Sequence, residues 1–122
     1  MGTADYSALE TLGHALARVA LAVDDPVLLV CSSDMNHYES AEIAARKDRM
    51  AIEKIQQVDA PGLYRVVLDE DISMCGFAPA VAVLTACSDL GAKAAHLIRY
   101  ANSGDVSGDY ERVVGYAGLA IV

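Results

Sequence analysis

The sequence has few of the residues that mark disulfide-stabilised, nucleic-acid-binding or membrane-spanning proteins. Three cysteines, with no Cys-x-x-Cys pair, are too few for a secreted disulfide framework, so we expect free thiols. Only 9 lysines and arginines stand against 17 aspartates and glutamates, and the net charge of −8 opposes binding to a phosphate backbone. No apolar run approaches the roughly 18 to 20 residues of a membrane-spanning helix. We therefore expect a cytoplasmic protein with no nucleic-acid and no membrane partner.

Apolar residues, in contrast, are abundant. They make up 54% of the 122 residues, and the mean hydropathy is +0.30. This is high for so small a protein, because a small body has proportionally more surface to cover with polar groups. The length predicts a single domain over residues 1–122, and the composition predicts that part of its apolar surface is buried against another chain.

Three segments predict helices. Apolar residues recur every three or four positions between about residues 7 and 22 and again between 39 and 57. A third helix is expected from Pro79 to about Leu90. Residues 63–68 fit either a turn of helix or a short strand.

Three segments predict strands. The run 27–31 is continuously apolar and short, which is typical of a strand buried on both faces. Residues 94–101 and 112–122 flank a turn-rich loop and predict an antiparallel pair. The expected fold class is α/β, with helices packed on a mixed sheet that ends in this C-terminal pair.

Asp34 and His37 follow directly after the predicted strand at 27–31, where open α/β sheets carry their chemistry. A histidine there can ligate a metal ion or carry a proton. Each residue also has a structural alternative. His37 could simply bond to nearby backbone, and Asp34 could cap the helix that follows.

Cys75 lies in residues 73–79 (Ser-Met-Cys-Gly-Phe-Ala-Pro), just before the third predicted helix. The amides and dipole at a helix N-terminus favour a thiolate, so Cys75 is a candidate soft ligand or nucleophile. The alternative is an inert buried thiol.

Asp48 falls within the apolar stripe of the helix predicted at 39–57. An unpaired buried carboxylate is too costly to keep, so Asp48 is expected either to bond to backbone amides or a positive group, or to support the neighbouring site. His14 is expected on the surface and His96 beside the core, with no partner evident for either.

Three separated motifs resemble those of the Memo family, whose prokaryotic members are called AmmeMemoRadiSam system protein B. They are Ser-Ser-Asp-Met-Asn-His-Tyr-Glu-Ser at 32–40, Asp-Ile-Ser-Met-Cys-Gly-Phe-Ala-Pro at 71–79, and Arg-Tyr-Ala-Asn-Ser-Gly-Asp-Val-Ser-Gly-Asp at 99–109. Val-Val-Gly-Tyr at 113–116 follows them. The resemblance implies a three-layer fold like that of class III extradiol dioxygenases. It covers the C-terminal half of such a domain, so residues 1–122 are expected to form about half of a Memo-like domain.

The resemblance also implies that Asp34, His37 and Cys75 are catalytic residues lining a pocket for iron or copper, with His37 and Cys75 as metal ligands. Asn36 stands where a serine is more usual. The family's other metal-site histidines lie in the N-terminal half, so we expect a homo-oligomer or a separate chain that carries this half. The implied function is metal-dependent redox or dioxygenase-like chemistry. The alternatives are a non-catalytic binding or interaction protein and an incomplete half-domain that self-associates.

Overall fold

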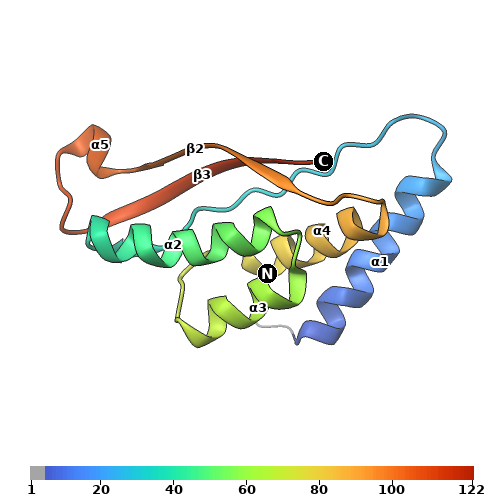
Figure 1. Ribbon diagram of the computed structural model, residues 1–122, viewed down its shortest axis with the longest axis horizontal. Helices are drawn as coiled ribbons and strands as arrows, with labels where there is room; N and C mark the ends of the chain where they lie inside the picture. Colours follow the sequence, from blue (N-terminus) through green and yellow to red (C-terminus); the bar gives the residue numbers. More distant parts are fainter. Residues whose placement is uncertain (1–4) are drawn as a thin grey trace.

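A three-stranded antiparallel sheet packs against a layer of helices (Figure 1). The computed structural model describes residues 5–122. Helix α2 contacts the sheet, α3 lies between α2 and α4, and α1 packs along α4. The fold is therefore α/β, as predicted. In chain order the elements are α1 (Tyr6–Ala22), β1 (His37–Glu39), α2 (Ala41–Gln56), α3 (Ala60–Asp69), α4 (Phe77–Asp89), β2 (Ala95–Asn102), α5 (Gly104–Ser107) and β3 (Val113–Ile121).

Local capping signals explain where the helices begin. The side chain of Asp5 accepts a hydrogen bond from the first turn of α1, and Ser40 does the same for α2. Because Ser40 caps α2, the suggestion that Asp34 caps this helix is wrong. Asp59 caps α3, which makes residues 63–68 helical. Helix α4 begins two residues before Pro79.

The sheet has the order β1-β3-β2, and both strand pairs are antiparallel. The predicted C-terminal pair is confirmed as β2 and β3. The sheet is not mixed as expected, because the strand that joins β3 on its other side is the short β1, where His37 faces Val114.

The predicted buried strand at 27–31 does not form. The segment is extended, but among the described residues its backbone bonds to no strand. Leu28 and Val30 are 84% and 78% exposed, whereas Leu29 and Cys31 are partly buried. This alternation is that of a strand with one face packed on the protein. The apolar pattern predicted a strand covered on both faces, but no neighbour among residues 5–122 covers the second face.

The two histidines outside the motifs lie on the surface. His14 of α1 pairs with Asp89 of α4, a partner that the sequence did not indicate. His96 of β2 is exposed and not beside the core as expected. Within residues 5–122, no helix has both the length and the apolar character needed to cross a bilayer.

Candidate functional site

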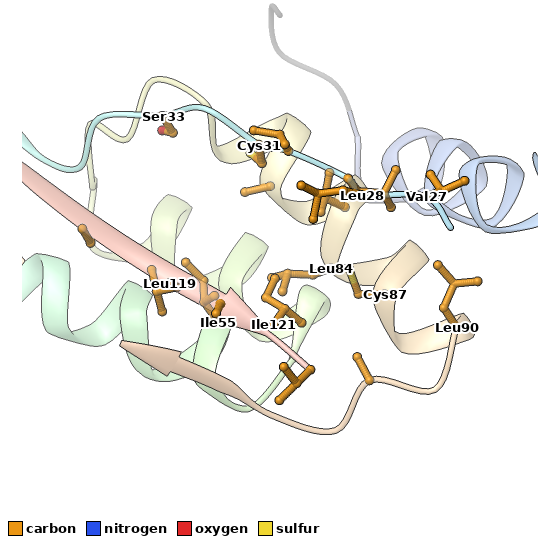
Figure 2. A pocket seen from close by; sticks show the side chains of 18 of the residues that line it. Val27, Leu28, Cys31, Ser33, Ile55, Leu84, Cys87, Leu90, Leu119 and Ile121 are labelled. Atoms are coloured by element: carbon orange, nitrogen blue, oxygen red, sulfur yellow. The ribbon is translucent and has the colours of Figure 1, made fainter. Parts of the chain in front are cut away.

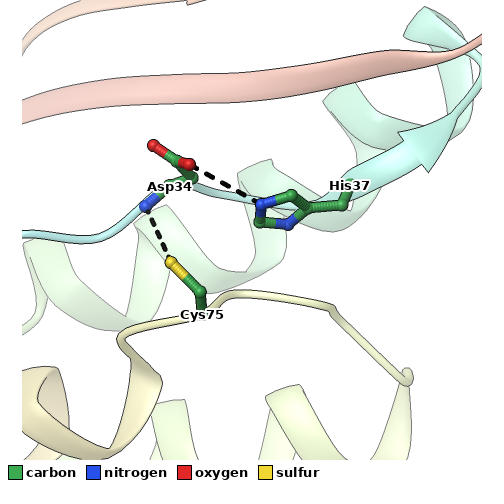
Figure 3. A group of neighbouring side chains, drawn as sticks. All are labelled: Asp34, His37 and Cys75. Carbon is green, nitrogen blue, oxygen red and sulfur yellow. Dashed lines mark hydrogen bonds and ion pairs between the residues drawn. The ribbon is translucent and has the colours of Figure 1, made fainter.

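Asp34, His37 and Cys75 come together in space (Figure 3). Asp34 precedes β1, His37 begins it, and Cys75 lies in the loop between α3 and α4. Each offers one ligand atom, and these atoms all lie within 4.8 Å of one another. His37 Nε2 is 3.6 Å from Asp34 Oδ2, and the backbone N–H of Asp34 donates to Cys75 Sγ at 3.3 Å. The structure therefore places a nitrogen, an oxygen and a sulfur donor close together.

Backbone pairing with β3 holds the segment that carries Asp34. The N–H of Met35 donates to Gly115 O at 2.8 Å, and the N–H of Gly115 donates to Asn36 O at 3.0 Å. Met35 and Asn36 are both buried. The site residues on either side of them are thus fixed to the sheet, even though the chain before them runs free of it.

A close approach at Gly76 holds the second loop against the first. The N–H of Gly76 donates to Ser33 Oγ at 2.8 Å, and a Cβ on Gly76 would lie 2.6 Å from Ser33 Cβ. Any larger residue at position 76 would push the two loops apart. Because Cys75 directly precedes Gly76 in the chain, this contact also sets the distance between Cys75 and Asp34.

His37 is bonded to backbone through one ring nitrogen and leaves the other for the site. Its Nδ1 lies 2.6 Å from Ser73 O, and since a carbonyl oxygen only accepts, Nδ1 carries the proton. In the neutral ring Nε2 then presents its lone pair toward Asp34 and Cys75, whereas a protonated ring would form an ion pair with Asp34. The side chain of His37 is 19% exposed. The backbone bond expected as the structural alternative for His37 is present, and it occupies Nδ1 only.

The three cysteines differ in environment. Cys75 is exposed, and its Sγ accepts the backbone N–H of Asp34. Cys31 and Cys87 are partly buried, and burial raises the pKa of both thiols. The charge of Cys75 raises the pKa of Cys31 further. Among the three, Cys75 is thus the thiol best placed to react or to bind a metal ion.

Asp48 contacts the site through the backbone of Asn36. It is fully buried, and its carboxylate accepts from the N–H of Asn36 at 2.8 Å and from the hydroxyl of Tyr100. The expected bond to a backbone amide is confirmed. Burial raises the pKa of Asp48, although the bonds from Tyr100 and Asn36 act against this rise. The Tyr100 partner joins residues 52 positions apart, so the sequence gave no local signal for it.

Gly115 provides the space for Asp48. A Cβ at position 115 would lie 2.0 Å from Asp48 Oδ2 and 2.9 Å from the hydroxyl oxygen of Tyr100. We expect Gly115→Ala to lower the free energy of unfolding by about 2 kcal/mol, in the range typical of overpacked cores. Gly118→Ala is the matched control, since a Cβ there meets nothing within 4 Å on the same strand. Equal urea midpoints for the two variants would contradict the prediction.

A separate apolar cavity of about 670 Å³ adjoins the site. Figure 2 shows its lining, with Leu28 of the extended segment on one side, Leu119 and Ile121 of β3 on another, and Leu84 of α4 between them. The three site side chains are not among its lining residues. The cavity therefore separates the unpaired run at 27–31 from β3 and lies outside the polar site.

The comparisons with known proteins agree with the motifs. The sequence profile of the Memo-like protein family matches residues 1–120. A MEMO1 family protein of Methanocaldococcus jannaschii is 41% identical over 117 residues, which are 96% of this chain and 41% of that protein. A MEMO1 family protein of Methanosarcina acetivorans is 39% identical over 121 residues, or 99% of this chain and 45% of that protein. The chain thus spans about two fifths of the length of the curated relatives that it matches. On this profile and these identities, the chain belongs to the Memo family.

Proposed function

We propose that His37 and Cys75 bind one transition-metal ion, iron or copper, with Asp34 beside it, and that this site serves redox or dioxygenase-like chemistry. The observation that carries the proposal is the meeting of three different donor atoms within 4.8 Å, in a chain of the Memo family. The orientation of His37 supports it. Histidine ligands commonly donate their second ring N–H to a backbone carbonyl, as Nδ1 of His37 does to Ser73.

The donor set fits such an ion. Imidazole and thiolate are ligands that suit iron, copper and zinc, whereas magnesium and calcium favour oxygen ligands. Two protein ligands leave coordination positions free for a substrate. A bound iron or copper ion would supply a redox centre and a Lewis acid. His37 and Cys75 would hold the ion, and the Asp34 carboxylate, 49% exposed, could accept a proton from a substrate hydroxyl.

Metal binding by the untagged chain tests the proposal. Anaerobic titration with Fe(II) or Cu(I), followed by elemental analysis, is expected to give about one ion per chain. His37→Ala and Cys75→Ala each remove a ligand, so we expect each to weaken binding by about 100-fold or more. His96→Ala and Cys87→Ala are the matched controls, since both residues lie outside the site, and they should bind as the wild type does. A wild-type chain that binds neither ion, or ligand variants that bind like the controls, would disprove the proposal.

A second proposal concerns partners. We infer that the exposed run at 27–31 is an interaction surface for a second copy of the chain or for a separate chain that carries the rest of a Memo domain. The exposure of Leu28 and Val30 favours this inference, because so exposed an apolar run is unusual for an isolated protein. The same surface would serve a non-catalytic binding function. The three free thiols support a cytoplasmic location for either function.

A further inference from the structure

The buried side chain of Asn36 connects the two loops of the site. Its Oδ1 accepts from both the N–H and the Oγ–H of Ser73, each at 2.9 Å. Its Nδ2 donates to Glu39 Oε1 at 3.0 Å. Because a backbone N–H can only donate, the Asn36 oxygen must face Ser73, which fixes the orientation of the amide.

Ser73 is in turn hydrogen-bonded to His37, and each of these bonds has one donor and one acceptor. Since the Ser73 hydroxyl proton points to Asn36, its Oγ has lone pairs free to accept the backbone N–H of His37 at 2.8 Å. The carbonyl of Ser73 accepts the Nδ1–H of the same histidine. Asn36 thus holds the residue whose carbonyl selects the protonated ring nitrogen of His37.

Asn36 is itself held rigidly. Its backbone N–H donates to Asp48, and its backbone oxygen accepts from Gly115. The Glu39 carboxylate that accepts from its side chain is also bonded to Lys47 Nζ at 2.8 Å. This Lys47 bond, with the Asn36 bond second, lowers the pKa of Glu39, so the carboxylate stays an acceptor at neutral pH. Asn36 is thus bonded through its backbone N–H, its backbone oxygen and both ends of its side-chain amide, which leaves the amide little freedom to reorient.

We propose that Asn36 is a positioning residue that, through Ser73, keeps neutral His37 in the Nδ1–H tautomer with the Nε2 lone pair facing Asp34 and Cys75. Free histidine in water favours the opposite tautomer, with the proton on Nε2. The consequence for metal affinity rests on the proposed function, but the tautomer itself does not. The side-chain amide of Asn36 reaches both Ser73 and Glu39.

The tautomer can be observed directly in the metal-free protein. Long-range ¹H–¹⁵N spectra of ¹⁵N-histidine-labelled chain at about pH 8, above the ordinary histidine pKa of about 6.5, report which ring nitrogen is protonated. We expect Nδ1–H to dominate for His37 in the wild type. Asn36→Ala should shift His37 toward the Nε2–H form. His14 is the internal control, because its pairing with Asp89 is remote from the site and unchanged signals show that the fold is intact.

Two further measurements separate this inference from the proposed function. Asn36→Ala should weaken Fe(II) or Cu(I) binding about 10- to 100-fold without changing the stoichiometry, as is typical for loss of a group that orients a ligand. If the wild type binds no metal but His37 shows the expected tautomer and loses it in Asn36→Ala, the metal site is disproved and the positioning role stands. If His37 carries its proton on Nε2 in the wild type, or keeps Nδ1–H in folded Asn36→Ala, the positioning role is overturned.

Should Asn36→Ala fail to fold, Ser73→Ala tests the same path with a smaller change. It removes only the hydroxyl that joins Asn36 to the His37 backbone and leaves the carbonyl at position 73. We expect a measurable Nε2–H fraction in this variant, smaller than that in Asn36→Ala. A His37 spectrum identical to that of the wild type would show that the path through Ser73 does not set the tautomer.

Discussion

Asp48→Ala should lower the free energy of unfolding by about 3 kcal/mol, since each buried donor left without an acceptor costs roughly 1 to 3 kcal/mol. The substitution leaves the N–H of buried Asn36 without an acceptor, and also the hydroxyl of Tyr100, which is partly buried. Urea unfolding followed by circular dichroism measures the loss. Asp69→Ala, at an exposed position on α3, is the control and should change stability by less than about 0.5 kcal/mol. Similar losses in the two variants would show that Asp48 does not join α2 to the site and to β2.

The pH dependence of the same carboxylate has a definite sign. The pKa of Asp48 is raised in the folded chain, so the folded state binds its proton more tightly than the unfolded state does. Its contribution to stability is then fully present below its ordinary value of 3.8 and is lost as the pH rises through the raised value. Asp48→Asn removes this titration while keeping an oxygen for Asn36. The stability of the wild type minus that of Asp48→Asn should therefore fall as the pH rises above about 4. The other carboxylates, including Glu39 nearby, titrate in both proteins. A difference that grows with pH would mean that the bonds to the ionised form outweigh its burial.

The parts of this fold that could be predicted are those determined by nearby residues. Helices α1 and α2 follow from apolar spacing over a few turns, and α4 follows from Pro79 near its start and Gly91 after its end. The β2–β3 pair follows from two apolar segments around a turn-rich loop. Strand β1 carries no such pattern. It is three residues long and forms because its backbone pairs with β3, more than 70 positions later.

The candidate site divides in the same way. Position after an apolar run, a helix start and the Memo motifs identified Asp34, His37 and Cys75. Ser73 and Tyr100, which hold Asn36 and Asp48 in place, could not be identified from spacing, because each contact joins segments 37 or 52 residues apart.

The run at 27–31 shows how a correct local pattern can give a wrong structural prediction. Its apolar residues predicted a strand with both faces buried, and the segment is indeed extended, with Leu29 and Cys31 turned inward. Whether a strand forms depends on a neighbour that supplies hydrogen bonds, and the described residues contain none for this segment. Beyond Gly115, the side of β3 that faces away from β2 also pairs with no described strand. The cavity of about 670 Å³ lies between these two unpaired edges.

Two unpaired edges on either side of an apolar cavity are suited to receive a strand from another molecule, through backbone bonds and apolar contact together. We therefore expect the chain alone to self-associate at micromolar concentrations. Light scattering coupled to size-exclusion chromatography should give a mass above the 12.9 kDa of one chain. Replacing both Leu28 and Val30 by aspartate should restore the monomer, because each added charge would have to be buried at the interface.

The same double substitution should leave the fold intact, since both side chains are mostly exposed. Val106→Asp is the matched control, because Val106 is 94% exposed but lies on α5, away from the cavity. It adds negative charge to a chain that already carries −8, so it separates local loss of apolar contact from general repulsion. A wild-type chain that stays monomeric, or a Val106→Asp variant that dissociates as fully as the double variant, would disprove association through residues 27–31. If only the double variant abolishes association, residues 27–31 are the segment through which the copies associate.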